Sequence, residues 1–242
     1  MFTVSSKDLV LQKAYVHWMS FIKEAGSTPE ASLVSSCFDN LVTRYTEPHR
    51  RYHTLEHIVS MLDEFMEVRI FLISPLSVQG GIWFHDVIYD VHSNCNEEAS
   101  AQYAYAELVQ LGVSESLILT VCHMIRVSDH KSSSLFESLD TQLFLDLDVA
   151  ILGKSWSEFL VFESGIRYEY QHVPELVYCR ERIKVLEALS SQLYMTEYGK
   201  QSYQLAASRN LKRMIAILRK RMGKRLTFLV KYDTIISVPK SC

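Results

Sequence analysis

The stretch LEHIVSMLDEFMEVRIF, residues 55–71, has the apolar spacing that decides the fold class. Leu55, Ile58, Leu62 and Phe65 follow one another at intervals of three or four residues. This interval places apolar side chains on one face of an α-helix, whereas a half-buried strand would alternate apolar and polar residues. The stretch is therefore predicted to be an amphipathic helix.

The same spacing extends along the chain on both sides of this stretch, and no segment alternates as a strand would. Short groups of Gly, Pro, Ser and Asn separate the helical stretches, without an internal repeat or a long linker. Further helices are predicted over residues 9–25, 30–45, 76–89, 97–111, 116–125 and 177–194. We expect an all-α fold, a compact helical bundle in which residues 1–242 form a single domain.

Composition excludes several protein classes. The 242 residues are 48% apolar, which is enough to bury one sizeable core. The longest apolar stretches, such as Arg69–Ser77, fall short of the roughly 20 residues that span a bilayer. Met1–Val10 lacks the pattern of a signal peptide, so we expect a cytoplasmic protein without a membrane span. The five cysteines are scattered and form no Cys-x-x-Cys pair, which argues against a disulfide framework or a thiolate zinc site.

Charge is distributed unevenly along the chain. Residues 1–210 carry 16 basic and 27 acidic side chains, whereas residues 211–242 carry 9 and 1. The basic stretch Leu211–Lys231 also has helical apolar spacing. We expect a C-terminal helix whose basic face is solvated or docks on the acidic remainder. Binding to an acidic membrane stays open, and we do not expect a nucleic-acid partner.

Two histidine-containing segments could carry chemistry. His53 and His57 are four residues apart, so a helix would direct both imidazoles to one face. The doublet His85-Asp86 is predicted to lie inside an apolar helix after Trp83 and Phe84. An ionised carboxylate in such surroundings must be paired or bound to a cation, and the neighbouring imidazole favours a metal ion.

Two further acids, Asp146 and Asp148, lie in the apolar run before Gly153. Residues two apart on a helix point in nearly opposite directions, so only one of them should face a given site. A His, a later His-Asp doublet and a distant Asp form, in this order, the ligand pattern of the HD-domain superfamily. The chain resembles that family, whose fold is helical and whose members are metal-dependent.

A motif within the superfamily refines this resemblance. Tyr52-His53-Thr54-Leu55-Glu56-His57 is similar to the Tyr-His-x-x-x-His signature of cyclic-nucleotide phosphodiesterases. The resemblance implies that His57 is a metal ligand, and that His53 is a general acid for the leaving oxygen or positions the phosphate. It also implies that Asp148 is the last metal ligand, in preference to Asp146.

A closer resemblance is to a family of predicted HD-type phosphohydrolases, and it extends from about Arg50 to about Leu211. Its motifs are Tyr-His-x-x-x-His, Trp-Phe-His-Asp, Asn-Glu, Asp-x-Asp-x-x-Ile-Leu-Gly and Arg-x-Glu-Tyr, and all are present in this order. Glu97 would lie near the metal or its water, although an acid in the first turn of a helix is the alternative. The candidates for substrate binding are Arg167, Tyr170, Arg182 and His130; structural salt bridges would explain the arginines equally well.

The resemblance implies a metal-dependent hydrolase of small phosphoesters, such as nucleotides. His57, His85, Asp86 and Asp148 would hold one ion, and Asp86 could bridge to a second. This ligand set suits Mn, Fe, Co, Ni or Mg. Two alternatives stay open: a non-catalytic metal-binding regulatory module, and an HD-type di-iron oxygenase with His123 and His130 as extra ligands. A homodimer is also left open.

Overall fold

Helices form the fold in the computed structural model, which describes residues 5–26, 29–129, 138–191 and 194–235. Within these ranges there is no β-strand, so the all-α prediction is confirmed. In chain order the elements are α1 Ser6–Glu24, α2 Ala31–Tyr45, α3 Leu55–Val68, η1 Arg69–Phe71, α4 Pro75–Phe84, α5 Asn96–Gln110, α6 Glu115–Val127, α7 Leu139–Asp148, η3 Ala150–Gly153, α8 Trp156–Glu169, α9 Glu175–Ser191, α10 Glu197–Gly199, η4 Lys200–Gln204 and α11 Leu205–Ile235.

One predicted helix end is wrong, and it concerns the His-Asp doublet. The prediction extended this helix to residue 89, but α4 ends at Phe84 and His85 is its C-cap. The buried guanidinium of Arg50 donates to the carbonyl oxygens of Asp86 at 2.7 Å and Val87 at 3.0 Å. These carbonyls therefore bind a side chain instead of continuing the helical ladder, and Asp86 lies in a turn.

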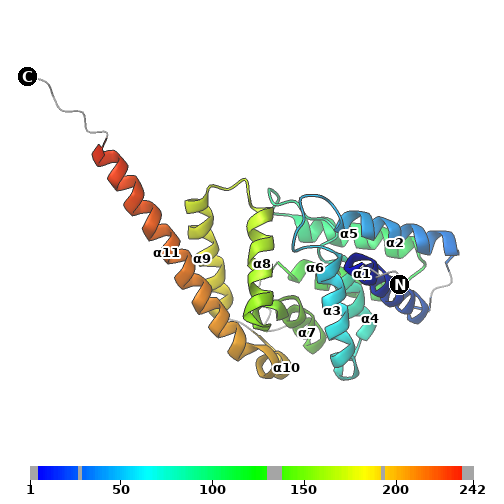
Figure 1. Cartoon of the computed structure of the whole chain (residues 1–242). Helices are drawn as coiled ribbons and strands as arrows, with labels where there is room; N and C mark the ends of the chain where they lie inside the picture. The colour runs from blue at the N-terminus through cyan, green and yellow to red at the C-terminus, as the bar shows by residue number, and fades with distance from the viewer. Residues whose placement is uncertain (1–4, 27–28, 130–137, 192–193, 236–242) are drawn as a thin grey trace, which may run out of the picture.

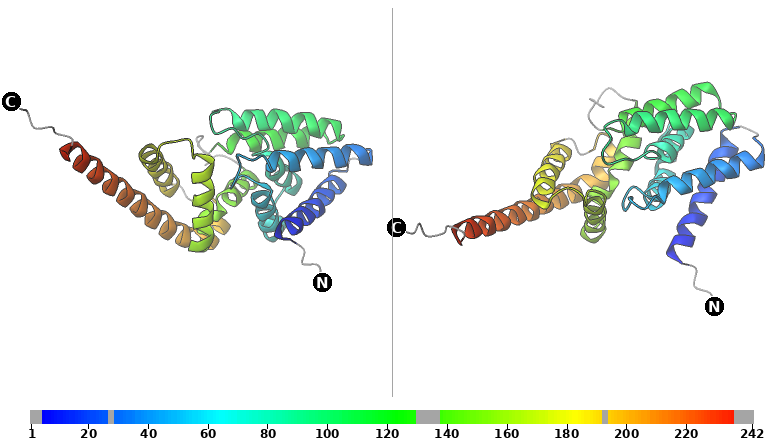
Figure 2. Two further views of the ribbon diagram at one scale, coloured as in Figure 1. Left: turned by 45° about the horizontal axis from the view of Figure 1, so that its top comes forward. Right: turned by 90° about the horizontal axis from the view of Figure 1, so that it is seen from above.

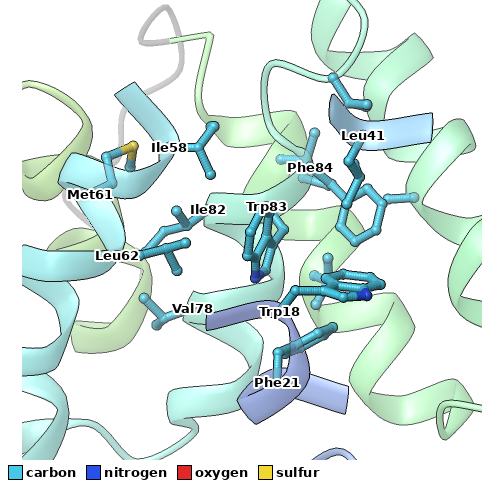
Figure 3. Close-up of a cluster of buried hydrophobic side chains, with 14 of the residues drawn as sticks. Trp18, Phe21, Leu41, Ile58, Met61, Leu62, Val78, Ile82, Trp83 and Phe84 are labelled. Carbon is cyan, nitrogen blue, oxygen red and sulfur yellow. The ribbon is translucent and has the colours of Figure 1, made fainter. Parts of the chain in front are cut away.

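A first core cluster lies among α1 to α7, and its centre is aromatic (Figure 3). Trp18 of α1 and Trp83 of α4 are fully buried and meet edge to face, with ring centroids 5.5 Å apart. Close approach of α4 to α6 requires Gly80, because a Cβ there would lie 2.6 Å from Cγ2 of Val121. This packing fixes α4, and with it the position of His85, against its neighbours.

A second core cluster runs from Ala150 to Leu218 and is built by α8, α9 and α11 with the segments before them. These three helices lie together on one side of the molecule, and α11 extends past α9 in all views (Figures 1 and 2). Asp148 lies in the chain between Leu147, the last residue of the first cluster, and Ala150. The junction of the two clusters is where the candidate site is found.

The basic C-terminal helix packs partly on acidic side chains, as expected. Arg219 of α11 is 2.6 Å from Glu187 of α9, and the Arg213 guanidinium lies over the ring of Trp156 at 4.0 Å.

In the parts of the chain that are described, no helix is long and apolar enough to cross a membrane.

Candidate metal centre

Three helix termini bring four potential metal ligands together. His57 is in the first turn of α3, His85 caps the end of α4 and Asp86 follows it. Asp148 is the last residue of α7. Side chains at helix ends are placed by the packing of whole helices, so the two core clusters determine how these groups meet.

The donor atoms converge on one point. Single ligand atoms of His57, His85 and Asp86 all lie within 4.8 Å of one another. Asp148 Oδ1 is 3.2 Å from His57 Nε2 and 3.4 Å from His85 Nε2. The two Nε2 atoms are 3.3 Å apart, and Asp86 Oδ2 lies 3.2 Å from that of His85.

The hydrogen bonding of His85 is compatible with metal binding. Its Nδ1 lies 3.1 Å from the carbonyl oxygen of Ile82, which can only accept, so Nδ1 carries a proton. In the neutral ring the lone pair is on Nε2, which faces the carboxylates. Histidine ligands usually donate their second ring nitrogen to a carbonyl or carboxylate in this way. Two imidazole nitrogens and two carboxylates also form a donor set that fits a divalent transition ion.

Electrostatics at the site favour a positive charge. Burial lowers the pKa of His85, but Asp86 and Asp148 outweigh it, and the pKa is raised well above its ordinary value. Burial raises the pKa of Asp86, yet His85 and His53 outweigh it, so that carboxyl stays ionised. The carboxylates therefore attract a cation to the imidazole nitrogens, and a proton or a metal ion can fill that role.

Next to the four ligands, Glu169 of α8 holds His53 in place. Its Oε2 lies 2.7 Å from His53 Nδ1 and accepts from Tyr89 at 3.0 Å. Its Oε1 accepts from the backbone N–H groups of Arg51, Tyr52 and His53 at 2.7, 2.7 and 3.1 Å. One buried carboxylate thus fixes both the loop before α3 and the orientation of the His53 ring.

These contacts shift both pKa values of the pair. Burial raises the pKa of Glu169, but the hydrogen bond and charge of His53 and the backbone donors lower it to about 2. Burial lowers the pKa of His53, but Asp86, Glu169 and Asp148 outweigh it and raise the pKa above its ordinary value. The two groups therefore favour a protonated imidazole at His53 beside an ionised carboxylate at Glu169.

Glu169 was predicted only as part of the Arg-x-Glu-Tyr motif, without a role of its own, and no role was predicted for Arg50. Glu169 is the last residue of α8, one helical turn after buried Gly165 and Ile166, so the cost of burying a carboxylate on that face could have identified it. Arg50 carries no such signal, because only the structure reveals that its guanidinium binds the backbone of residues 53, 86 and 87.

The two arginines predicted to bind substrate are engaged in the fold. Arg167 donates to Glu175 at 3.2 Å and to the carbonyls of Tyr170 at 2.7 Å and Val173 at 3.1 Å. Arg182 forms an ion pair with Glu163 at 2.6 Å. These contacts match the salt-bridge alternative. Half-buried Tyr170 packs against the second core cluster.

The remaining predicted residues have different outcomes. Asp146 accepts from the backbone of Met195 at 2.8 Å and from Thr196 at 2.9 and 2.6 Å, so it faces away from His57. Glu97 lies in the first turn of α5, and no hydrogen bond or ion pair joins it to the four ligands in the described part of the chain. His130 lies outside the described residues.

A cavity of 720 Å³ opens beside the ligands and includes His57 and Asp148 in its wall. This volume is in the range of small-molecule sites, roughly 300–1,000 Å³. Apolar side chains from α1, α2, α3 and α8 form much of the wall; they are Val10, Leu11, Val42, Leu55, Met61 and Val161. The cavity can therefore take an organic group whose polar end meets His57 and Asp148.

No protein-family model, curated protein or solved structure matches this chain.

Proposed function

We propose that this chain is a metal-dependent phosphohydrolase of the HD type, acting on a nucleotide or another small phosphoester. One observation carries the proposal: the donor atoms of His57, His85, Asp86 and Asp148 converge beside half-buried His53 and its buried partner Glu169, and His57 and Asp148 line a cavity. The order of these residues in the sequence and their resemblance to HD hydrolases support it.

His57, His85, Asp86 and Asp148 would hold the ion. A divalent ion of Mn, Fe, Co, Ni or Mg, single or paired, would supply a Lewis acid and lower the pKa of a coordinated water. Four protein ligands leave room for water and a phosphoryl oxygen in an octahedral shell.

His53 would protonate the leaving oxygen. Its Nδ1 proton is held by Glu169, so Nε2 is the nitrogen left to serve the substrate. The raised pKa favours the doubly protonated ring, whose Nε2 proton would pass to the leaving oxygen as that oxygen's bond to phosphorus breaks, while the Nδ1 proton stays with the ring. General acid catalysis of this kind contributes roughly 100- to 10,000-fold in rate.

Arg50 would hold His53 and Asp86 in fixed positions relative to each other. It donates to the carbonyl of His53 at 3.1 Å and to that of Asp86 at 2.7 Å. The general acid and a metal ligand are thereby held by a single planar guanidinium, which a lysine could not imitate.

A panel of phosphomonoesters and phosphodiesters tests the proposal. The full chain, stripped of metal, is assayed with Mn, Co, Ni, Mg and Fe separately, together with Asp86→Ala. We expect phosphate release that depends on the ion and is lost in the variant. A protein that binds none of these ions, or activity that survives Asp86→Ala, would contradict it. Metal binding without turnover would favour a regulatory module, and bound iron with oxygen consumption would favour an oxygenase.

A further inference from the structure

Arg51 stands in the wall of the cavity, two residues before His53, and the mechanism above does not use its side chain. Its backbone is fixed, because the N–H donates to Glu169 Oε1 at 2.7 Å. The side chain is exposed. The same carboxylate that orients His53 therefore also fixes the point from which the Arg51 guanidinium extends.

The Arg51 guanidinium has no partner in the described part of the chain. No hydrogen bond, ion pair or ring contact of its side chain is found among the residues that the structure describes. Its neighbour Arg50 binds Glu47 and three carbonyl groups. Of the two arginines in the cavity wall, Arg50 is thus bound within the fold, whereas the donors of Arg51 are available to a ligand.

Two further cations besides the arginines line the cavity, Lys154 and Lys7. Lys154 forms an ion pair with Glu64, which also accepts from Tyr203, so its charge is neutralised within the wall. Lys7 belongs to α1, where Asp8 follows it in the wall. Arg51 is the cation that the chain places closest in sequence to the candidate acid His53 and ligand His57.

We propose that Arg51 binds the anionic oxygens of the substrate's phosphoryl group and makes the cavity specific for phosphoesters over uncharged esters. The inference rests on the proposed function, because it assumes that the phosphoryl group lies at the four ligands. A guanidinium presents two parallel donors that match two phosphoryl oxygens. An ion bound at the ligands neutralises only part of the phosphoryl charge, and Arg51 supplies a second positive group.

Binding of inorganic phosphate to the Mn-loaded full chain tests this without requiring turnover. Calorimetric titrations compare the wild type with Arg51→Gln, Arg51→Lys and Arg209→Gln. Arg209 is the matched control: it is exposed, its side chain has no protein partner among the described residues, and it does not line the cavity. We expect Arg51→Gln to raise the Kd for phosphate roughly 10- to 100-fold, Arg51→Lys to recover part of the loss, and Arg209→Gln to match the wild type.

The outcomes separate the two proposals. Phosphate affinity that is equal in Arg51→Gln and the wild type, or lowered as much by Arg209→Gln, would overturn the role of Arg51 even in an active hydrolase. Weaker binding in Arg51→Gln would support it even if no ester of the panel is hydrolysed. Where turnover is observed, Arg51→Gln should raise KM for a phosphomonoester more than it lowers kcat. An unchanged Tm in Arg51→Gln should accompany these results, because the side chain makes no packing contact that the fold needs.

Discussion

Replacing Glu169 by glutamine tests how strongly the buried carboxylate stabilises the fold. In the folded chain its pKa is about 2, against an ordinary value of 4.5. This difference corresponds to about 3 kcal/mol of stability at neutral pH. Because the folded pKa is the lower one, the contribution is complete above pH 4.5 and is lost as the pH falls toward 2. Glutamine keeps an oxygen for the backbone donors but loses the charge that His53 requires.

The assay is urea unfolding of the wild type and Glu169→Gln at pH 7, 5, 4 and 3, followed by circular dichroism. The variant should be less stable by about 3 kcal/mol at pH 7, and the difference should shrink below pH 4.5. Glu98→Gln is the control, because Glu98 forms an exposed ion pair with Arg126 and should matter little. The reasoning is refuted if Glu169→Gln costs no more than Glu98→Gln at pH 7, or if its cost is independent of pH.

Four further substitutions have distinct expected results. Asp86→Ala should lower the affinity for Mn at least about 100-fold, as read from bound metal after dialysis, and unchanged metal content would contradict its role as a ligand. Asp148→Asn should also weaken metal binding. Asp146→Asn should leave metal binding intact but lower the free energy of unfolding by about 1–3 kcal/mol, because Asp146 binds the backbone before α10. Equal effects of the two variants on metal affinity would refute this distinction. Gly153→Ala should destabilise the fold by about 1–3 kcal/mol, because the new Cβ would lie 2.7 Å from the Cα of Tyr203. Thermal unfolding measures this, and an unaltered Tm would contradict it by showing that the backbone moves to accommodate the Cβ.

Periodicity in the sequence predicted α1 to α6 and α9, most of which bury one apolar face, but it did not predict α8. It also separated Asp146 from Asp148 correctly as facing different ways, since the argument needs only helix geometry. The gathering of His57, His85 and Asp148 is now observed, while their role as metal ligands stays a prediction.

Features that depend on distant parts of the chain could not be predicted in this way. The end of α4 is determined by Arg50, which lies more than thirty residues earlier in the chain. The role of Glu169 depends on donors in the loop before α3, which no local pattern links to α8. Arg167 and Arg182 could bind phosphate or form salt bridges on chemical grounds alone, and only their partners show which they do.

Asp148 lies between the two core clusters, while His57 and His85 belong to the helices of the first. An ion held by all three would therefore tie one core to the other, and its binding energy would enter the cooperativity of unfolding. We expect the chain to lose its single unfolding transition when a chelator removes the ion, because the second cluster can then open before the first. The supply of metal would in this way set the lifetime of the folded chain as well as its activity.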